Sequence, residues 1–224
     1  NQPLLKNRRH KLRVQQVRRQ KIFLTCLFSA DRGLYPSAFF PNFSGRQKET
    51  HQINAACEAY RDEVSSEAAQ YDMSDYVDLI LAVMMQESSG QGTDPMQSSE
   101  GAYNTRYPQQ PNGITDPSYS ISCGIQELKY ALEKAVCTGP TDLSKIRLAL
   151  QAYNFGADSY FAYLEENGQT VWTAQSAQAF AQMASGGTQR DEDDPLHDPA
   201  GPWDYGDQYY PDHVLRYYHL DNNS

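Results

Sequence analysis

The chain has 224 residues, 39% hydrophobic and 21% charged, which is typical of a soluble globular protein with one sizeable core. Its charge is uneven: residues 1–30 hold eight Lys and Arg side chains and no acid, and the rest holds 11 basic against 28 acidic groups. A body this acidic repels nucleic-acid phosphates, so we expect no nucleic-acid partner, and any such role is restricted to the N-terminal arm.

The N-terminal arm joins a basic stretch to a short apolar run. Residues 22–30 (IFLTCLFSA) are its longest uncharged run, shorter than the about 20 apolar residues that a membrane-spanning helix needs. A basic stretch followed by an apolar run is typical of an export signal or a shortened membrane anchor. We therefore expect residues 1–49 to be an irregular arm and linker, with membrane or wall association through residues 1–30, and residues 50–224 to form one domain.

Cysteine and histidine spacings indicate neither a disulfide framework nor a structural metal. Four cysteines are too few for a disulfide scaffold, and the chain has no C-x-x-C pair and no zinc-like histidine spacing. The acidic stretch over residues 185–202 does not match the ligand spacing of an EF-hand, which favours a solvated loop over a calcium loop. We expect buried free thiols, no metal and no cofactor.

Apolar residues at spacings of three and four predict helices through the first half of the domain. One helix of about five turns runs from Thr50 with a stripe from Ile53 to Tyr71, and a second follows Ser74 as its N-cap and ends at residues 88–90. Residues 90–120 then hold Gly, Pro, Asn, Asp and Ser without periodicity. So long a connection is typical of a functional loop.

Helical periodicity returns after this loop. The expected helices are one with a stripe from Ile125 to Val136, one capped by Thr141 and ending at Gly156, a short one over Tyr160 to Leu164, one around Phe180, and a terminal one from Pro211 to His219. No stretch alternates apolar and polar residues over the length of a strand. The pattern therefore predicts an all-α fold.

The first segment with catalytic chemistry is residues 86–90 (QESSG). Glu87 follows Met84 by three positions, so its carboxyl group projects from the buried face of the last helical turn. Apolar surroundings raise the pKa of a carboxyl group and keep it protonated near neutral pH. Glu87 is therefore a candidate general acid, and the alternative is an ordinary glutamate at an exposed helix end.

Two further segments carry neutral polar groups. Residues 120–126 (SISCGIQ) predict a small-residue turn that enters a helix, where Gly124 allows close approach and the amide of Gln126 suits sugar hydroxyls and N-acetyl groups. Residues 152–156 (AYNFG) close a helix at a glycine with an aromatic ring and an amide. Taken singly, each segment is equally typical of an ordinary helix end.

Together, and in this order, the three segments resemble those of the goose-type lysozyme and lytic transglycosylase superfamily. With residues 94–100 (DPMQSSE) and the terminal segments 205–207 (YGD) and 214–218 (VLRYY), the tract is similar to the lysozyme domain of CwlT-type cell-wall hydrolases over about residues 50–220. The resemblance implies a lysozyme-like helical domain with a long active-site loop. Beside the catalytic Glu87, it implies as substrate-binding residues Ser88, Gln97, Ser98, Gln126, Tyr153 and Asn154.

The resemblance also implies an N-acetylmuramidase that cleaves the β-1,4 bond between N-acetylmuramic acid and N-acetylglucosamine in the glycan strands of peptidoglycan. Glycosidases normally pair two acids, and the long loop offers Asp94, Glu100 and Asp116 as the second. If none of these reaches, the 6-hydroxyl of the sugar can attack instead, which makes the enzyme a lytic transglycosylase. We expect hydrolysis, by a monomer that is secreted or associated with the bacterial cell surface. CwlT-type relatives often carry a following cysteine-peptidase domain, and we expect none in this chain.

Two other classes of function stay open. A non-catalytic glycan-binding module would keep Gln126, Tyr153 and Asn154 and could dispense with the acid, so the presence of Glu87 disfavours it. A nucleic-acid-binding accessory protein would depend on the basic arm alone.

Overall fold

The computed structural model describes residues 51–194 and 197–220, so the predicted arm over residues 1–49 lies outside the described residues. Within them the chain is helical and has no strand, only an isolated bridge between Gln189 and Trp203. The all-α prediction is confirmed. The helices are α2 (Ala55–Glu58), α3 (Arg61–Gln70), η3 (Ser74–Tyr76), α4 (Val77–Ser88), α5 (Pro117–Lys134), α6 (Leu143–Phe155), α7 (Ala157–Glu166), α8 (Ala174–Ser185) and α9 (Tyr210–Leu215).

The single first helix predicted from Thr50 is wrong, because the chain divides it into α2 and α3. α2 docks on the end of α4: Asn54 Nδ2 donates to the Ser89 carbonyl oxygen at 3.0 Å, and Gly90 lies so close to Ala56 that a Cβ there would meet its backbone. α3 packs along α4 and α5 instead. The chain therefore bends between the two helices, so that α2 contacts the end of α4 while α3 packs along α4 and α5.

Helix starts also differ from the predicted ones. Ser74 begins the 3-10 turn η3 and makes no cap hydrogen bond to α4, and Asp142, not Thr141, accepts the capping bond at the start of α6. α5 begins at Pro117, where Asp116 accepts hydrogen bonds from the backbone of Ser118 and Tyr119. The predicted turn over residues 120–126 therefore lies inside a helix.

Helix ends depart from the predicted periodicity as well. The stripe drawn through Val136 is wrong at that residue, which follows α5 with a positive φ of 57° and leaves 72% of its surface exposed. α6 does end at Gly156, whose φ of 86° suits a residue without a Cβ. α9 stops at Leu215, four residues before the predicted His219.

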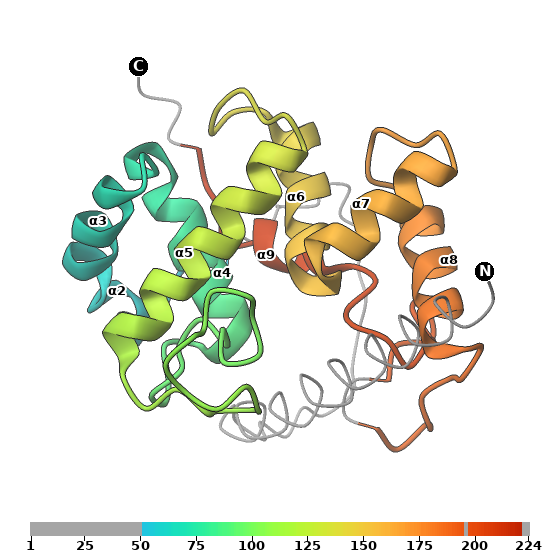
Figure 1. Ribbon diagram of the computed structural model, residues 1–224, viewed down its shortest axis with the longest axis horizontal. Helices are drawn as coiled ribbons and strands as arrows, with labels where there is room; N and C mark the ends of the chain where they lie inside the picture. The colour runs from blue at the N-terminus through green and yellow to red at the C-terminus, as the bar shows by residue number, and fades with distance from the viewer. Residues whose placement is uncertain (1–50, 195–196, 221–224) are drawn as a thin grey trace, which may run out of the picture.

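The core is built around α4 and α6. α4 buries six consecutive side chains from Leu79 to Met84, and α6 contacts α5, α7 and α9. Figure 1 shows α2 to α5 in one half of the molecule and α6 to α8 in the other, with α9 between them and the long loop (green) below α4 and α5 in this view. These two halves supply the walls of the candidate site.

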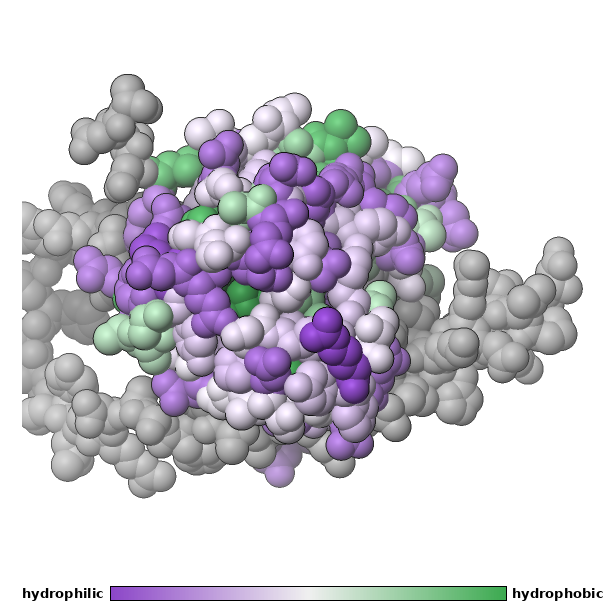
Figure 2. Space-filling model, turned by 60° about the vertical axis from the view of Figure 1, so that its left-hand side comes forward, coloured by the Kyte–Doolittle hydropathy of each residue, from purple (hydrophilic) through white to green (hydrophobic). Residues whose placement is uncertain are grey.

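The outer surface in the view of Figure 2 is mostly hydrophilic, with small separate hydrophobic areas. Among the described helices, none combines the length and the apolar character needed to cross a bilayer. Of the four cysteines, Cys57 and Cys123 are buried and free, and Cys137 is half-buried and free. Cys26 lies outside the described residues.

Candidate functional site

A cavity of about 550 Å³ lies between the two halves of the fold. One side is lined by the end of α4, the long loop and α5, and the other by the end of α6, the start of α7 and the C-terminal segment through α9. Among the described residues, its lining includes seven acidic side chains, which are Glu87, Asp94, Glu100, Glu127, Asp158, Asp198 and Asp207. Two arginines, Arg190 and Arg216, also line it, so acidic groups outnumber arginines and the cavity suits the stabilisation of positive charge.

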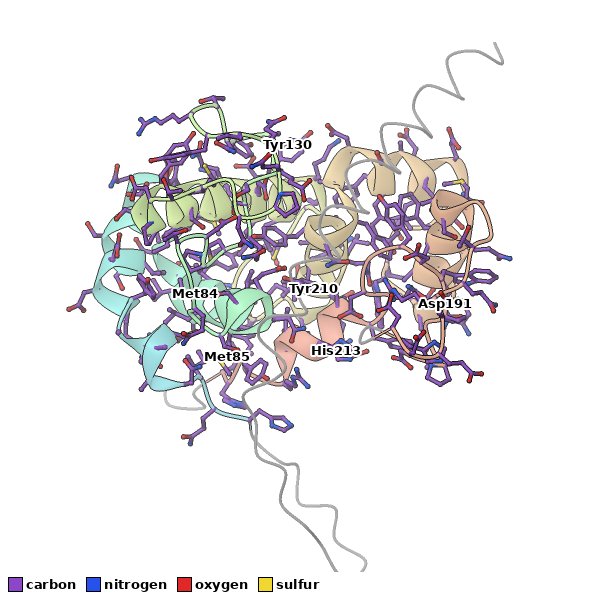
Figure 3. The ribbon with its side chains drawn as sticks, turned by 90° about the horizontal axis from the view of Figure 1, so that it is seen from below. Met84, Met85, Tyr130, Asp191, Tyr210 and His213 are labelled. Atoms are coloured by element: carbon purple, nitrogen blue, oxygen red, sulfur yellow. The ribbon has the colours of Figure 1, made fainter. Side chains whose placement is uncertain are left out.

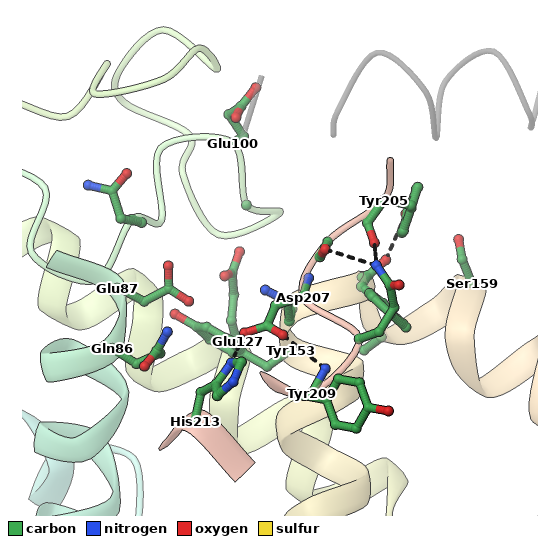
Figure 4. A pocket seen from close by; sticks show the side chains of 18 of the residues that line it. Gln86, Glu87, Glu100, Glu127, Tyr153, Ser159, Tyr205, Asp207, Tyr209 and His213 are labelled. Carbon is green, nitrogen blue, oxygen red and sulfur yellow. Dashed lines mark hydrogen bonds and ion pairs between the residues drawn. The ribbon is translucent and has the colours of Figure 1, made fainter. Parts of the chain in front are cut away.

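Glu87 lies in the last turn of α4 and points into this cavity (Figure 4). The Tyr210 hydroxyl donates a hydrogen bond to Glu87 Oε1 at 2.5 Å. Tyr210 is fully buried at the start of α9, which lies against α4 (Figure 3). Burial is the largest cause that raises the pKa of Tyr210 well above its usual range, and the neighbouring charge of Glu87 is the next. The tyrosine stays a protonated donor and holds the carboxyl group in place.

Tyr153 connects the core to the long loop. Its hydroxyl donates to the Met96 carbonyl oxygen at 3.0 Å, and its ring stacks on that of Tyr210 with centroids 6.3 Å apart. The side chain lines the cavity with 6% of its surface exposed. Tyr153 thus forms part of the cavity wall while its hydroxyl anchors the loop.

Asn154 holds the segment that carries Asp207. Its Oδ1 accepts from the Asp207 backbone N–H at 2.9 Å, and Gln151 Nε2 donates to the Asp207 carbonyl oxygen at 2.8 Å. Gly206 packs so closely that a Cβ there would lie 2.6 Å from Asn154 Oδ1. Asn154 lines the cavity, and its Oδ1 holds the backbone of the Asp207 segment in place.

Asp207 and His213 form an ion pair at the cavity wall. His213 Nδ1 and Asp207 Oδ2 lie 2.5 Å apart, and Asp207 Oδ1 accepts from the Tyr209 backbone N–H at 2.9 Å. The hydrogen bond that the ring donates to Asp207 raises the pKa of His213, against the lowering effect of burial. Sequence analysis included Asp207 only within the terminal segment 205–207 and gave it no role, and it missed His213, since neither residue lies at an interpretable spacing from Glu87.

Asp94 organises the long loop. Its two oxygens accept from the backbone of Ser98 and Ser99 at 2.9 and 3.1 Å, and from the hydroxyls of Ser99 and Ser120 at 2.5 and 2.6 Å. The side chain is 1% exposed. Four donors satisfy this carboxylate, which ties the loop to α5.

The serines predicted to bind substrate face inward. Ser88 is 2% exposed and donates to the Pro95 carbonyl oxygen at 2.7 Å, and Ser98 is fully buried. Neither lines the cavity, whereas Gln97 does. Gln97 adopts a positive φ of 49°, and its amide donates to the Asp94 carbonyl oxygen at 2.8 Å.

Gln126 also lies away from the cavity. Its amide donates to the Ser122 carbonyl oxygen at 3.2 Å, and Ser122 in turn pairs with the Tyr71 hydroxyl on α3. The next residue, Glu127, lines the cavity instead. One residue turns a helix by about 100°, so the two side chains face different neighbours.

A stripe on α5 faces the long loop and could have predicted Glu127. Ser120 binds Asp94, a Cβ on Gly124 would lie 2.6 Å from Met96, and a Cβ on Gly101 would meet the carboxylate of Glu127. Spacings of four and three place Ser120, Gly124 and Glu127 on one helix face. This three-residue pattern can be recognised in the sequence only if the helix is predicted to start at the Asp-Pro pair of residues 116–117.

Comparison with known proteins gives one family and several relatives. The sequence model of the lysozyme-like family matches residues 55–218. The bifunctional muramidase/DL-endopeptidase CwlT of Bacillus subtilis (strain 168) is 35% identical over 169 residues, which are 75% of this chain and 44% of that protein. The uncharacterized membrane protein YocA of the same organism is 40% identical over 115 residues, covering 50% of this chain and 45% of that protein.

A solved structure agrees with the fold. The crystal structure of a protein described as similar to lipoprotein, NLP/P60 family, from Staphylococcus aureus subsp. aureus Mu50 aligns with a TM-score of 0.64 and 27% identity. The alignment covers 78% of this chain and 56% of that one. The chain spans about half the length of the curated relatives it matches.

Proposed function

The chain belongs to the lysozyme-like family, and we propose that it is a peptidoglycan N-acetylmuramidase acting on the β-1,4 bond between N-acetylmuramic acid and N-acetylglucosamine. The observation that carries this proposal is the position of Glu87, which points into an acid-lined cavity and is held by the fully buried Tyr210. A relative named as a muramidase supports the same class of substrate.

Glu87 acts in this proposal as the general acid. Oε1 accepts the hydrogen bond from Tyr210, so a proton on the carboxyl group resides on Oε2 and can pass to the leaving O4 of N-acetylglucosamine. Proton donation by a positioned acid contributes about 10²–10⁴-fold to the rate. The carboxylates that line the cavity stabilise the positive charge that develops at C1 and the ring oxygen.

The cell wall is the proposed place of action. Peptidoglycan strands lie outside the bacterial membrane, and one relative is named a membrane protein. The basic cluster over residues 1–30 would favour attachment to an anionic wall or lipid surface, since the rest of the chain is acidic.

The test is digestion of purified peptidoglycan, with mass spectrometry of the released fragments. We expect reducing N-acetylmuramic acid ends from the wild type and at least about a 100-fold lower rate from Glu87→Gln, because an amide cannot donate the proton. Glu166→Gln is a matched control, since Glu166 also lies in the last turn of a helix but is exposed outside the cavity. Anhydro ends would identify a lytic transglycosylase, and binding without cleavage would identify a glycan-binding module.

A further inference from the structure

Two tyrosines line one end of the cavity. Tyr103 belongs to the long loop and Tyr130 to α5, and each residue is half-buried. Resting on the proposed function, we propose that these two rings form a sugar-binding subsite for a part of the glycan strand that lies beyond the cleaved bond. Tyr103 and Tyr130 then determine how strongly the enzyme prefers long strands over short ones.

Neither ring belongs to the hydrophobic core, although both are half-buried. Among the described residues, the half-buried tyrosines that pack on the core are Tyr60, Tyr71, Tyr76, Tyr163 and Tyr217. Core packing therefore does not explain why Tyr103 and Tyr130 lie in the cavity wall. Aromatic rings in such walls are typical of ligand contacts.

The ring of Tyr130 is held in place from α7. Its hydroxyl donates to Asp158 Oδ1 at 2.5 Å. Lys134 Nζ donates to the same oxygen at 2.9 Å and lies 5.3 Å from the centre of the Tyr130 ring. Asp158 is the second residue of α7, so these bonds join α5 to α7 at this end of the cavity. A ring fixed in this way loses little further freedom when a ligand stacks on it.

The backbone around Tyr103 is fixed by hydrogen bonds. The Tyr119 hydroxyl on α5 donates to the Tyr103 carbonyl oxygen at 3.2 Å and accepts from the Thr105 N–H at 3.0 Å. The neighbouring Asn104 is 2% exposed, and its amide donates to two carbonyl oxygens of the same loop at 2.6 and 3.1 Å. These bonds tie the loop to α5 and set where the Tyr103 ring lies.

Tyr103 faces the corner of the cavity that holds Tyr130. Burial is the largest cause that raises the pKa of Tyr103, and charges on α5 and α7 raise it further, which are those of Glu127, Tyr130, Glu133 and Asp158. The phenol therefore lies near the end of α5 that carries Tyr130. It stays protonated near neutral pH and can donate a hydrogen bond.

This corner lies apart from the position of cleavage. Figure 3 shows Tyr130 on one side of Tyr210 and His213 on the other. Tyr210 holds Glu87, and both Tyr130 and His213 line the cavity. The cavity therefore continues on both sides of the catalytic carboxyl group. A strand with its scissile bond at Glu87 meets Tyr130 with a sugar further along the chain.

The side chains in this corner suit a sugar. A sugar ring has an apolar C–H face and hydroxyl groups around its edge, and tyrosine combines an aromatic face with a hydroxyl group. Ser159, in the first turn of α7, adds a further hydroxyl group to the same wall. The subsite therefore binds by stacking and by neutral hydrogen bonds.

The first experiment measures kcat/KM on glycan fragments of peptidoglycan that grow by one disaccharide at a time. For the wild type, kcat/KM should rise until the fragment reaches the two rings. Tyr103→Ala should lower kcat/KM on long fragments by about 3- to 10-fold, the effect of one aromatic contact, and leave that on the shortest cleaved fragment within about twofold. Equal losses on short and long fragments would overturn the subsite, because a general loss of structure does not depend on substrate length.

Tyr107→Ala is the matched control for Tyr103→Ala. Tyr107 is half-buried on the same loop, lies outside the cavity, and has its ring centroid 5.4 Å from that of Tyr119. This variant should keep the wild-type ratio of kcat/KM between long and short fragments. A fall in that ratio as large as in Tyr103→Ala would show that loop packing sets the preference and would contradict the proposal.

The second experiment separates the Tyr130 ring from its hydroxyl. Tyr130→Phe keeps the ring and removes the bond to Asp158, whereas Tyr130→Leu removes both. Tyr130→Phe should keep the preference for long fragments within about twofold, and Tyr130→Leu should lower it by about 3- to 10-fold. An equal loss in the two variants would assign Tyr130 to the bridge between α5 and α7 and rule out stacking.

The third experiment measures binding without cleavage and separates the two proposals. In a Glu87→Gln background, calorimetric titration should give a lower Kd for long fragments than for short ones, and Tyr103→Ala should raise the Kd of the long fragments by about 3- to 10-fold. Tight binding of long fragments through Tyr103 by a wild type that does not cleave them would overturn the muramidase and leave the subsite. Cleavage and binding without any dependence on length would overturn the subsite and leave the muramidase.

Discussion

Tyr210 donates a 2.5 Å hydrogen bond to Glu87 Oε1 although 123 positions separate the two residues. Tyr210 is fully buried at the start of α9, and Glu87 ends α4. The carboxyl group proposed as the general acid is therefore oriented by the last helix of the described chain.

The Tyr210→Phe variant should lower kcat by about 10- to 100-fold, because it removes the hydroxyl that holds Glu87 Oε1 and misplaced catalytic groups lose rate at this scale. Tyr160→Phe removes another fully buried hydroxyl, one that faces Ser176 far along the chain from Glu87, and serves as control. Steady-state kinetics and thermal melts of both variants measure the effect. Equal losses of activity in the two would show that a buried hydroxyl matters only for stability.

The Asn154→Ala variant should lower the free energy of unfolding by about 1–3 kcal/mol, since the Asp207 N–H loses its acceptor beside the cavity. Its activity should fall as well, because Asp207 lines the cavity. Gln126→Ala should leave kcat/KM within about twofold of the wild-type value, since its amide donates to the Ser122 carbonyl oxygen on α5. Denaturant melts and kinetics compare the two, and a larger kinetic loss for Gln126→Ala would restore it as a substrate-binding residue.

The His213 and Asp207 pair should make stability fall as pH rises. Hydrogen bonding to Asp207 raises the folded-state pKa of His213 above its unfolded value of about 6.5. The contribution is therefore fully present below pH about 6.5 and is lost as pH rises through the raised pKa. His213→Gln should remove this part of the pH dependence of unfolding, measured between pH 5 and 9, and His219→Gln, at an exposed position, should keep it.

The cysteine thiols should react in an order set by burial. Burial raises the pKa of Cys57 to about 12 and that of Cys123 to about 11, so few thiolates form at pH 8. Cys137 is half-buried and should be alkylated first among these three. Iodoacetamide labelling of the folded protein followed by peptide mass spectrometry gives the order, and rapid labelling of Cys57 would contradict the packing of α2 on α4.

The N-terminal arm should be separable from the domain. Deletion of residues 1–49 should leave a protein that melts in one cooperative transition and digests isolated peptidoglycan at the full rate, because the helices of the core begin at Ala55. The deletion should weaken association with cells at low salt, since eight basic groups are removed. Loss of stability on deletion would show that the arm packs on the domain.

Local properties of the sequence predicted the helical class and the position of Glu87 at a helix end. A helix face repeats every 3.6 residues, so the buried stripe from Ile125 to Leu132 is visible without knowledge of the fold. Glycine at position 156 marked a helix end for an equally local reason, because a residue without a Cβ tolerates the positive φ that the structure shows there. The resemblance in motif order added the family.

The tertiary structure decided which polar residues share the cavity. Asp94 and Ser98 belong to a motif that resembles an active site, yet burial assigns them to loop folding. Glu127 and Gln126 are adjacent in sequence, and only the helix start at Pro117 and the contacts of α5 turn Glu127 toward the cavity. Periodicity reports which residues are buried, whereas contacts across more than a hundred positions, such as Tyr210 with Glu87, depend on how helices pack and have no local signature.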